Sequence, residues 1–262
     1  MPRFEREAIK QALTTSTVGQ EVHFWPAIGS TMDAARQLAD DGAPEGTLAL
    51  TDEQTAGRGR LQRSWWAPPG TSLLMTLVLR PDLSPVQAQR LVMVCSLAVC
   101  AAIRKVTGLV ARVKWPNDVL IEGKKVCGIL TELGITGSKL DYVLVGMGIN
   151  VNCDFSQAPE MMSPPTSLRM ETGHDVSRLD LLTVLLSEIE RRYEALRQGR
   201  FDQNEWAAHL ETIGREVTVS SGDERWAGLA TGVDEDGALL IRLPDESVQR
   251  VLAGDVTLRE HG

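Results

Sequence analysis

The sequence predicts an α+β fold in two parts, a large domain of helices and strands over residues 1–213 and a small β-rich domain over residues 214–262. Patterns typical of helices and strands follow one another up to about residue 210, and only short strand patterns at regular spacing come after that point. The chain has 262 residues, of which 43% are hydrophobic and 24% charged, so it is long enough for one large and one small hydrophobic core.

The first half of the large domain contains two helices with clear ends. Ser30 or Thr31 is a good N-cap for the first, which Gly42 ends. Ser84-Pro85 begins the second, which is apolar on all sides and therefore predicts a buried helix. In chain order we expect a short helix at 5–13, a strand at 22–27, a helix at 31–41, strands at 48–50 and 73–79, and the buried helix at 84–107.

The second half of the large domain contains a predicted hairpin and a long helix. The turn Glu122-Gly123-Lys124 separates the two hairpin strands, and Ser177-Arg178-Leu179-Asp180 resembles a capping box at the start of the helix. The expected elements are a strand at 110–114, strands at 119–121 and 126–133, a glycine-containing strand from 142 to about 152, a loop at 155–165, and helices at 177–199 and 201–210.

The last part of the chain predicts a small all-β barrel of about 48 residues. Turn clusters such as Ser221-Gly222-Asp223 separate its strand patterns. We expect strands at 216–220, 225–232, 238–242, 248–252 and 256–259.

Charge and cysteine content exclude several classes of protein. The formal net charge of −8 argues against general affinity for nucleic acid. The four cysteines show no CxxC spacing, so we expect reduced core residues of a cytoplasmic protein and neither a disulfide framework nor a zinc site. The first ten residues do not resemble a signal peptide, and no apolar run predicts a membrane span.

A glycine- and arginine-rich segment at residues 51–66, the arginine loop, lies between two predicted strands. Gly57 and Gly59 allow its backbone to approach a ligand closely. Its guanidinium groups suit carboxylate and phosphate oxygens, and two tryptophans add flat apolar surface: Arg58, Arg60, Arg63, Trp65 and Trp66. The pattern favours a mobile lid over an anionic, partly apolar ligand. A solvated arginine turn above packed tryptophans is the alternative.

A second polar segment, the 114–118 turn (Lys114-Trp115-Pro116-Asn117-Asp118), follows a predicted strand. The ammonium group of Lys114 at the strand end can offset negative charge that develops during a reaction. Asn117 and Asp118 can position a metal or a hydroxyl, or they can cap the turn. Ser30 and Thr31 add polar groups at a helix start, where capping is the alternative role. Together these features describe the activation of a carboxylate by a nucleotide.

Other chemistries find no pattern in the sequence. The four histidines show no triad or metal-ligand spacing. The sequence also contains no GxxxxGK[ST] segment and no GxGxxG segment that opens a helix after a strand.

Four ordered segments make the chain resemble the biotin protein ligase family, over roughly residues 22–260. They are Gly57-Arg58-Gly59-Arg60, the 114–118 turn, Gly128-Ile129-Leu130-Thr131-Glu132 and Gly148-Ile149-Asn150. Ser30-Thr31 and the tail at 254–259 add to the match. The resemblance implies a mixed-sheet catalytic domain similar to class II aminoacyl-tRNA synthetases and a C-terminal SH3-like barrel.

The resemblance also implies an activity. Such a ligase makes biotinyl-5′-AMP from biotin and ATP with Mg²⁺, releases pyrophosphate, and transfers biotin to one lysine of a biotin carboxyl carrier domain of acetyl-CoA carboxylase or a related carboxylase. The short segment before residue 22 leads us to expect no DNA-binding domain, no specific DNA partner and no membrane partner. Either a monomer or a homodimer agrees with the resemblance, and the metal ligands stay unassigned.

Site residues carry over by position. Lys114 and Arg60 would be catalytic, and the biotin contacts would come from Ser30, Thr31, Met32, Gln54, Arg58, Gly59, Arg60 and Lys114. The nucleotide would lie near Arg58, Arg60, Arg63, Trp65, Asn117 and Asn150.

The chain departs from the family pattern at two places. Met32 replaces an asparagine common in relatives, so a side-chain amide contact is missing there. Leu61-Gln62 replaces the basic or glycine residues that often continue the arginine loop, which puts retention of the adenylate in question. A lipoate or octanoate protein ligase or transferase of the same fold, and a non-enzymatic binding module, are the alternatives.

Overall fold

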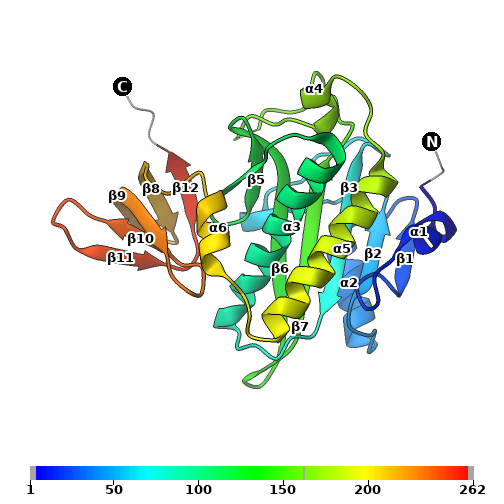
Figure 1. Ribbon diagram of the computed structural model, residues 1–262, viewed down its shortest axis with the longest axis horizontal. Helices are drawn as coiled ribbons and strands as arrows, with labels where there is room; N and C mark the ends of the chain where they lie inside the picture. Colours follow the sequence, from blue (N-terminus) through cyan, green and yellow to red (C-terminus); the bar gives the residue numbers. More distant parts are fainter. Residues whose placement is uncertain (1–3, 162, 259–262) are drawn as a thin grey trace.

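The computed structural model describes residues 4–161 and 163–258. It contains two separate sheets, and helices flank the larger one (Figure 1). The smaller sheet is formed by the last part of the chain and lies beside the end of helix α6 (Figure 1).

The larger sheet has seven strands in the order β1-β2-β3-β7-β6-β5-β4. The β1–β2 pair is parallel and every other pair is antiparallel, so the sheet is mixed. Its strands are β1 (Val22–Trp25), β2 (Thr47–Thr51), β3 (Ser72–Leu79), β4 (Arg112–Lys114), β5 (Asp118–Ile121), β6 (Lys124–Thr136) and β7 (Lys139–Asn150).

The two faces of this sheet are covered differently. Helices α3 (Gln89–Thr107) and α5 (Arg178–Arg197) pack together over one face, where the main core forms (Figure 1). Helix α2 (Thr31–Asp40) packs on the other face through a smaller cluster that includes Met32, Ala35 and Leu144. The remaining helices are α1 (Arg6–Ala12), α4 (Leu168–Thr172) and α6 (Gln203–His209), with short 3₁₀ turns at Arg60–Gln62 and Val86–Ala88.

The C-terminal sheet has five antiparallel strands in the order β11-β10-β9-β8-β12. Its strands are β8 (Glu216–Ser221), β9 (Glu224–Val233), β10 (Leu239–Arg242), β11 (Val248–Val251) and β12 (Asp255–Leu258). In β10, for example, Leu239 and Ile241 are buried and the residues after them are not. Arg259, with which the last predicted strand ended, lies outside the described residues.

Most predicted elements are confirmed to within a few residues, with two differences. Strand β6 continues to Thr136, and β7 begins at Lys139. The hairpin that they form is therefore longer than the sequence predicted. Helix α4, which Ser167 caps, was not predicted because it lasts only five residues.

Helix α3 and its 3₁₀ start form the one segment, among the described residues, that is long and apolar enough to cross a membrane. In its most apolar window, 72% of the residues are buried inside the protein, as in a core helix. All four cysteines are free and buried, as the sequence predicted. Burial raises the pKa of the Cys95 thiol to about 12.

Candidate active site

A cavity of about 400 Å³ opens on the face of the large sheet that carries α2. The arginine loop, the start of α2, strands β6 and β7, and the segments 155–161 and 163–165 surround it. The 114–118 turn and Asp255 of the C-terminal sheet complete its wall. Residues separated by up to 224 positions, from Thr31 to Asp255, therefore meet at one site.

Trp65 lies against a part of the sheet where glycines leave room for its ring. A Cβ atom on Gly148 would come within 2.5 Å of this ring, and one on Gly128 within 2.9 Å. Gly146 leaves similar space for the Met32 sulfur, which a Cβ would approach to 2.7 Å. The three glycines of β6 and β7 therefore let the ring and the sulfur approach the backbone of the sheet closely. The Trp65 indole Nε1 is buried without a hydrogen-bond partner among the described residues.

One end of the cavity is polar and uncharged. The Thr31 N–H donates to Gln54 Oε1 over 2.8 Å, and its Oγ1 hydroxyl donates to the same oxygen over 3.0 Å. Thr76 Oγ1 donates in turn to Thr31 Oγ1 over 2.9 Å. Ser30 is not in the cavity wall, because its Oγ accepts from the Met32 N–H and caps α2. Capping, the alternative role of Ser30, is the one that the structure shows.

Two arginines of the arginine loop form the opposite, cationic end. Arg60 Nη1 donates to Asn117 Oδ1 over 2.8 Å, and its Nη2 donates to the Gly254 carbonyl over 3.0 Å. Arg63 forms an ion pair with Asp255. Burial lowers the pKa of the Arg60 guanidinium, while the charges of Asp255 and Asp118 oppose that effect. Both arginines therefore contact the C-terminal sheet.

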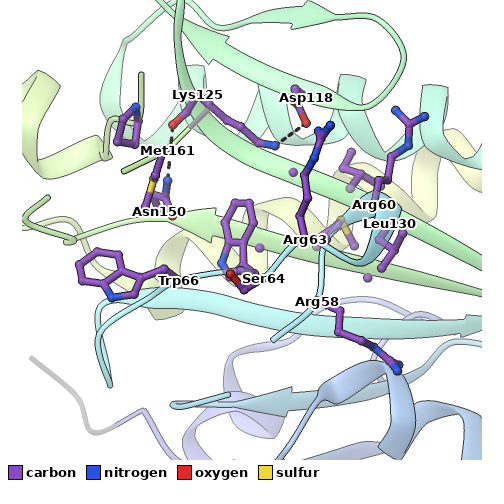
Figure 2. A pocket seen from close by; sticks show the side chains of 18 of the residues that line it. Arg58, Arg60, Arg63, Ser64, Trp66, Asp118, Lys125, Leu130, Asn150 and Met161 are labelled. Carbon is purple, nitrogen blue, oxygen red and sulfur yellow. Dashed lines mark hydrogen bonds and ion pairs between the residues drawn. The ribbon is translucent and has the colours of Figure 1, made fainter. Parts of the chain in front are cut away.

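Arg58 lines the cavity but points toward helix α2 (Figure 2). It is paired with Asp33 at 2.5 Å and lies 3.8 Å from Glu132. The neighbouring Gly59 also lines the cavity. The sequence grouped Arg58 with Arg60, but the structure directs their side chains to different partners.

The lysine that faces this cavity is Lys125 of β6. Its Nζ lies 2.7 Å from Asp118 Oδ1 and 5.5 Å from the centre of the Trp65 ring (Figure 2). Lys114 ends β4 as predicted, but it is not among the residues that line the cavity. Lys114 pairs across the turn with Asp118, so the turn brings Asn117 and Asp118 to the cavity and leaves Lys114 on the edge strand.

The segment after β7 closes the remaining side. Asn150 is buried at 3% exposure and donates from Nδ2 to the Thr166 carbonyl over 3.0 Å. The Phe155 ring lies 5.6 Å from that of Trp66, at an angle of 47°. This wall is therefore partly aromatic.

Most of the predicted residues are brought together here. The structure places these in the cavity wall: Thr31, Met32, Gln54, Arg58, Gly59, Arg60, Arg63, Trp65, Asn117 and Asn150. Sequence analysis missed Lys125, Asp255 and Glu160. Lys125 could have been found, because it lies on the same strand as Gly128. Nothing in the sequence near Asp255 indicates that this residue of the other sheet reaches the cavity.

Comparison with known proteins agrees with this arrangement. Residues 25–150 match the model of the biotin/lipoate A/B protein ligase family, and residues 212–259 match that of the biotin protein ligase C-terminal domain. The chain is 36% identical to the biotin–[acetyl-CoA-carboxylase] ligase of Paracoccus denitrificans, over 82% of this chain and 91% of that protein. The chain belongs to the biotin protein ligase family.

Two further relatives match most of this biotin protein ligase. The bifunctional ligase/repressor BirA of Bacillus subtilis is 33% identical over 98% of this chain and 79% of its own length. The biotin protein ligase of Aquifex aeolicus, solved in complex with biotin and ATP, superimposes with a TM-score of 0.78 at 29% identity. That match covers 92% of this chain and 100% of the other.

Proposed function

We propose that this biotin protein ligase joins biotin and ATP into biotinyl-5′-AMP in the cavity beneath the arginine loop. It then transfers biotin to one lysine of a biotin carboxyl carrier domain of acetyl-CoA carboxylase or a related carboxylase. One observation carries the proposal: a single cavity combines a neutral polar end, an apolar wall and a cluster of cations. A small apolar acid with a polar head and a nucleotide together need those three surfaces.

The first step is the attack of a biotin carboxylate oxygen on the α-phosphorus of ATP. A new P–O bond forms, the bond to the β-phosphate oxygen breaks, and pyrophosphate leaves with the bonding electrons. Two anions must approach each other, so cations that offset their repulsion lower the barrier. Arg60, Arg63 and Lys125 are the cavity cations best placed for this work.

The sequence predicted the cation role for Lys114. We propose Lys125 in its place, because Lys125 lines the cavity and Lys114 does not. The Asp118 carboxylate at 2.7 Å holds the Lys125 ammonium toward the wall that Arg63 also approaches (Figure 2). A phosphate oxygen at this point would compete with Asp118 for the ammonium group.

Biotin itself suits the other end of the cavity. The face of Trp65 and the side chains of Met32 and Leu130 offer apolar contact to its ring and valeryl chain. Thr31 and Gln54 offer hydroxyl, N–H and amide groups to its polar head. Neutral groups suit a neutral urea, because a charge buried there without a partner would be costly.

We propose that Mg²⁺ enters as the complex with ATP. Three carboxylates line the cavity, and two of them are already paired, Asp118 with Lys125 and Asp255 with Arg63, so with Glu160 they fit a supporting role only. Within residues 4–161 and 163–258, no group of three or more His, Cys, Asp or Glu residues is placed to hold a metal. Mg²⁺ commonly uses one or two carboxylates together with substrate phosphates. When bound it would neutralise the charge of the leaving pyrophosphate.

The second step is the attack of the carrier lysine amine on the biotinyl carbonyl carbon. An amide bond forms, AMP leaves with the bonding electrons, and the nitrogen releases one proton. A lipoyl or octanoyl substrate would follow the same chemistry, but it lacks the polar head that Thr31 and Gln54 can bind. This difference supports biotin over those acids.

Further parts of the proposal concern the fold and its setting. We propose that the boundary lies near residue 213, that the large domain resembles class II aminoacyl-tRNA synthetases, and that the C-terminal domain is an SH3-like barrel. The separate sheets support the boundary. Four free, buried cysteines support a cytoplasmic location, and the net charge of −8 supports the absence of operator-specific DNA binding.

Two assays test the proposal on the full chain. We expect ATP–pyrophosphate exchange that depends on biotin, and a carrier domain whose mass rises by one biotinyl group when ATP and Mg²⁺ are present. Exchange that lipoate or octanoate supports better than biotin would transfer the assignment to the alternative ligases. Exchange with none of these acids would favour the binding-module alternative.

A further inference from the structure

Trp115, the second residue of the 114–118 turn, contacts the C-terminal part of the chain and does not line the cavity. Its side chain is 1% exposed, and its indole Nε1–H donates to the Gly237 carbonyl over 2.9 Å. Its backbone N–H donates to Thr212 Oγ1 over 3.0 Å, just before β8 begins. Gly237 lies in the turn between β9 and β10 and is buried. One residue of the turn is therefore anchored at two points of the C-terminal part of the chain.

The same turn holds the cationic end of the cavity two residues later. Asn117 Oδ1 accepts the 2.8 Å hydrogen bond from Arg60, and Asp118 pairs with Lys125 at 2.7 Å. Asn117 is fixed in turn to β6, because its Nδ2 donates to the Ile129 carbonyl over 2.6 Å and its own carbonyl accepts from the Ile129 N–H over 3.0 Å. Only two or three residues of backbone separate Trp115 from Asn117 and Asp118, so a shift of Trp115 is passed on to their contacts.

Arg60 also receives a direct contact from the C-terminal sheet, through the Gly254 carbonyl at 3.0 Å. Two routes therefore lead from that sheet to one guanidinium group: the first through Gly254, and the second through Gly237, Trp115 and Asn117. The C-terminal sheet therefore reaches both hydrogen-bond acceptors of Arg60: Gly254 directly, and Asn117 through Trp115, in addition to the hold that β6 has on Asn117.

We propose that Trp115 is a positioning residue, which sets Asn117 and Asp118 according to where the C-terminal sheet is docked. It touches neither substrate, and it acts on the nucleotide end through Arg60 and Lys125. This inference rests on the proposed function, because the effect of replacing Trp115 is measured as a change in the KM for ATP. A tryptophan that only fills the core would affect stability alone.

The test replaces Trp115 by phenylalanine in the full chain. Trp115→Phe keeps an aromatic ring but removes the indole N–H, so the buried Gly237 carbonyl loses its partner and the turn is free to shift. We expect the KM for ATP in biotin-dependent pyrophosphate exchange to rise about fivefold to tenfold. The Kd of biotin, measured by calorimetry, should stay within about twofold, because the neutral end of the cavity does not contact the turn.

Trp206→Phe is the matched control. Trp206 is 0% exposed, and its indole donates over 3.0 Å to Ser96 Oγ, between α6 and α3. The control loses the same kind of buried hydrogen bond and should lower Tm to a similar degree, with the KM for ATP unchanged. If Trp206→Phe raises that KM as much as Trp115→Phe does, the proposal is wrong and the effect is one of general stability.

A double-mutant cycle with Asn117→Ala tests the route. If Trp115 acts partly through Asn117, Trp115→Phe should raise the KM for ATP by a smaller factor in the Asn117→Ala background than in the wild type, because only the route through Asp118 and Lys125 remains. If the KM for ATP of the double variant rises by the full product of the two single-variant factors, the inference is wrong. If Trp115→Phe does not fold, Thr212→Val decides instead: it removes the other anchor of Trp115 and should raise the same KM. Absence of exchange in the wild-type protein would count against the proposed function, which keeps the two failures apart.

Discussion

The two faces of the seven-stranded sheet differ in the size of their side chains beside the cavity, and strand β7 contributes to both faces. On the α3/α5 face, Val145 and Ile149 are large, 0% exposed and part of the main core. On the other face the alternate positions are Gly146 and Gly148, which leave space for Met32 and Trp65. One face fills its volume with side chains throughout, whereas the other is packed at Leu144 under α2 and lacks side chains at the two glycines beside the cavity. Stability and function are therefore separated by a single residue step along one strand.

Ile149→Ala tests the face that carries stability. Removing this buried side chain should cost about 2–5 kcal/mol in the free energy of unfolding, measured in urea, because a cavity remains under α3 and α5. The KM for ATP and the affinity for biotin should change little in the folded fraction. Loss of biotin binding by a fully folded Ile149→Ala protein would mean that the two faces are not independent.

Gly148→Ala is the counterpart one residue earlier. Its Cβ would meet the Trp65 ring at 2.5 Å, so the ring must move into the cavity. We expect pyrophosphate exchange to fall at least tenfold while the free energy of unfolding changes less than in Ile149→Ala. Retained exchange would show that Trp65 does not define the cavity.

Lys125→Ala tests the cations of the site face. Loss of a cation aimed at developing charge costs on the order of 3 kcal/mol, or about 10²-fold in the rate of adenylation. Lys114→Ala, four residues before Asp118 and outside the cavity wall, should have a much smaller effect. The opposite order of effects would return the role to Lys114, as the sequence first predicted.

Arg60→Gly should release biotinyl-5′-AMP into solution. The substitution removes the contacts to Asn117 and Gly254 that hold the arginine loop on the cavity. A lost charge-assisted hydrogen bond costs about 1.5–3 kcal/mol, enough to raise the open population at least tenfold. Streptavidin blotting of albumin added to the reaction should then show biotin on a bystander protein. If the adenylate off-rate and the blot match wild type, the loop is a solvated turn and not a lid.

Leu61→Asn should give the smallest effect. Leu61 is 69% exposed and has a φ of 53°, a left-handed conformation that asparagine adopts more easily than leucine. We expect the folded loop to gain about 0.5–1 kcal/mol, seen as slower limited proteolysis near residue 61. Leu61→Ala keeps the backbone constraint and serves as control. Equal protection in the two variants would remove the conformational explanation.

The sequence supplied the elements of both faces because their signals are local. Ser84-Pro85 and Gly108 bound the segment that contains α3, and Gly57 to Arg63 stand out between two apolar strands. Local signals do not say which way neighbouring strands direct their side chains. Lys114 and Lys125 lie on strands separated only by β5, and a β-bulge between Val119 and Leu120 shifts the register between β5 and β6. The choice of lysine depends on that register.

Contacts between the two sheets were beyond prediction for a different reason. Arg63 and Asp255 are 192 residues apart, and neither has a neighbour in sequence that indicates the other. Their meeting depends on how the C-terminal sheet docks, and the hydrogen bond from Trp115 to the Gly237 carbonyl is one of the contacts made there. The contact between Trp115 and Gly237 could not be predicted for the same reason, because the residues around Trp115 in sequence indicate only a polar turn.

Each arginine of the arginine loop already lies beside a carboxylate of the protein, and this governs how ionic strength acts on ATP binding. Arg58 pairs with Asp33, and Arg60 and Arg63 lie beside Asp255. Incoming phosphates exchange with these internal counter-ions instead of displacing salt ions from solution. We therefore expect the logarithm of the ATP affinity to fall less steeply with the logarithm of the salt concentration than the number of arginines would suggest.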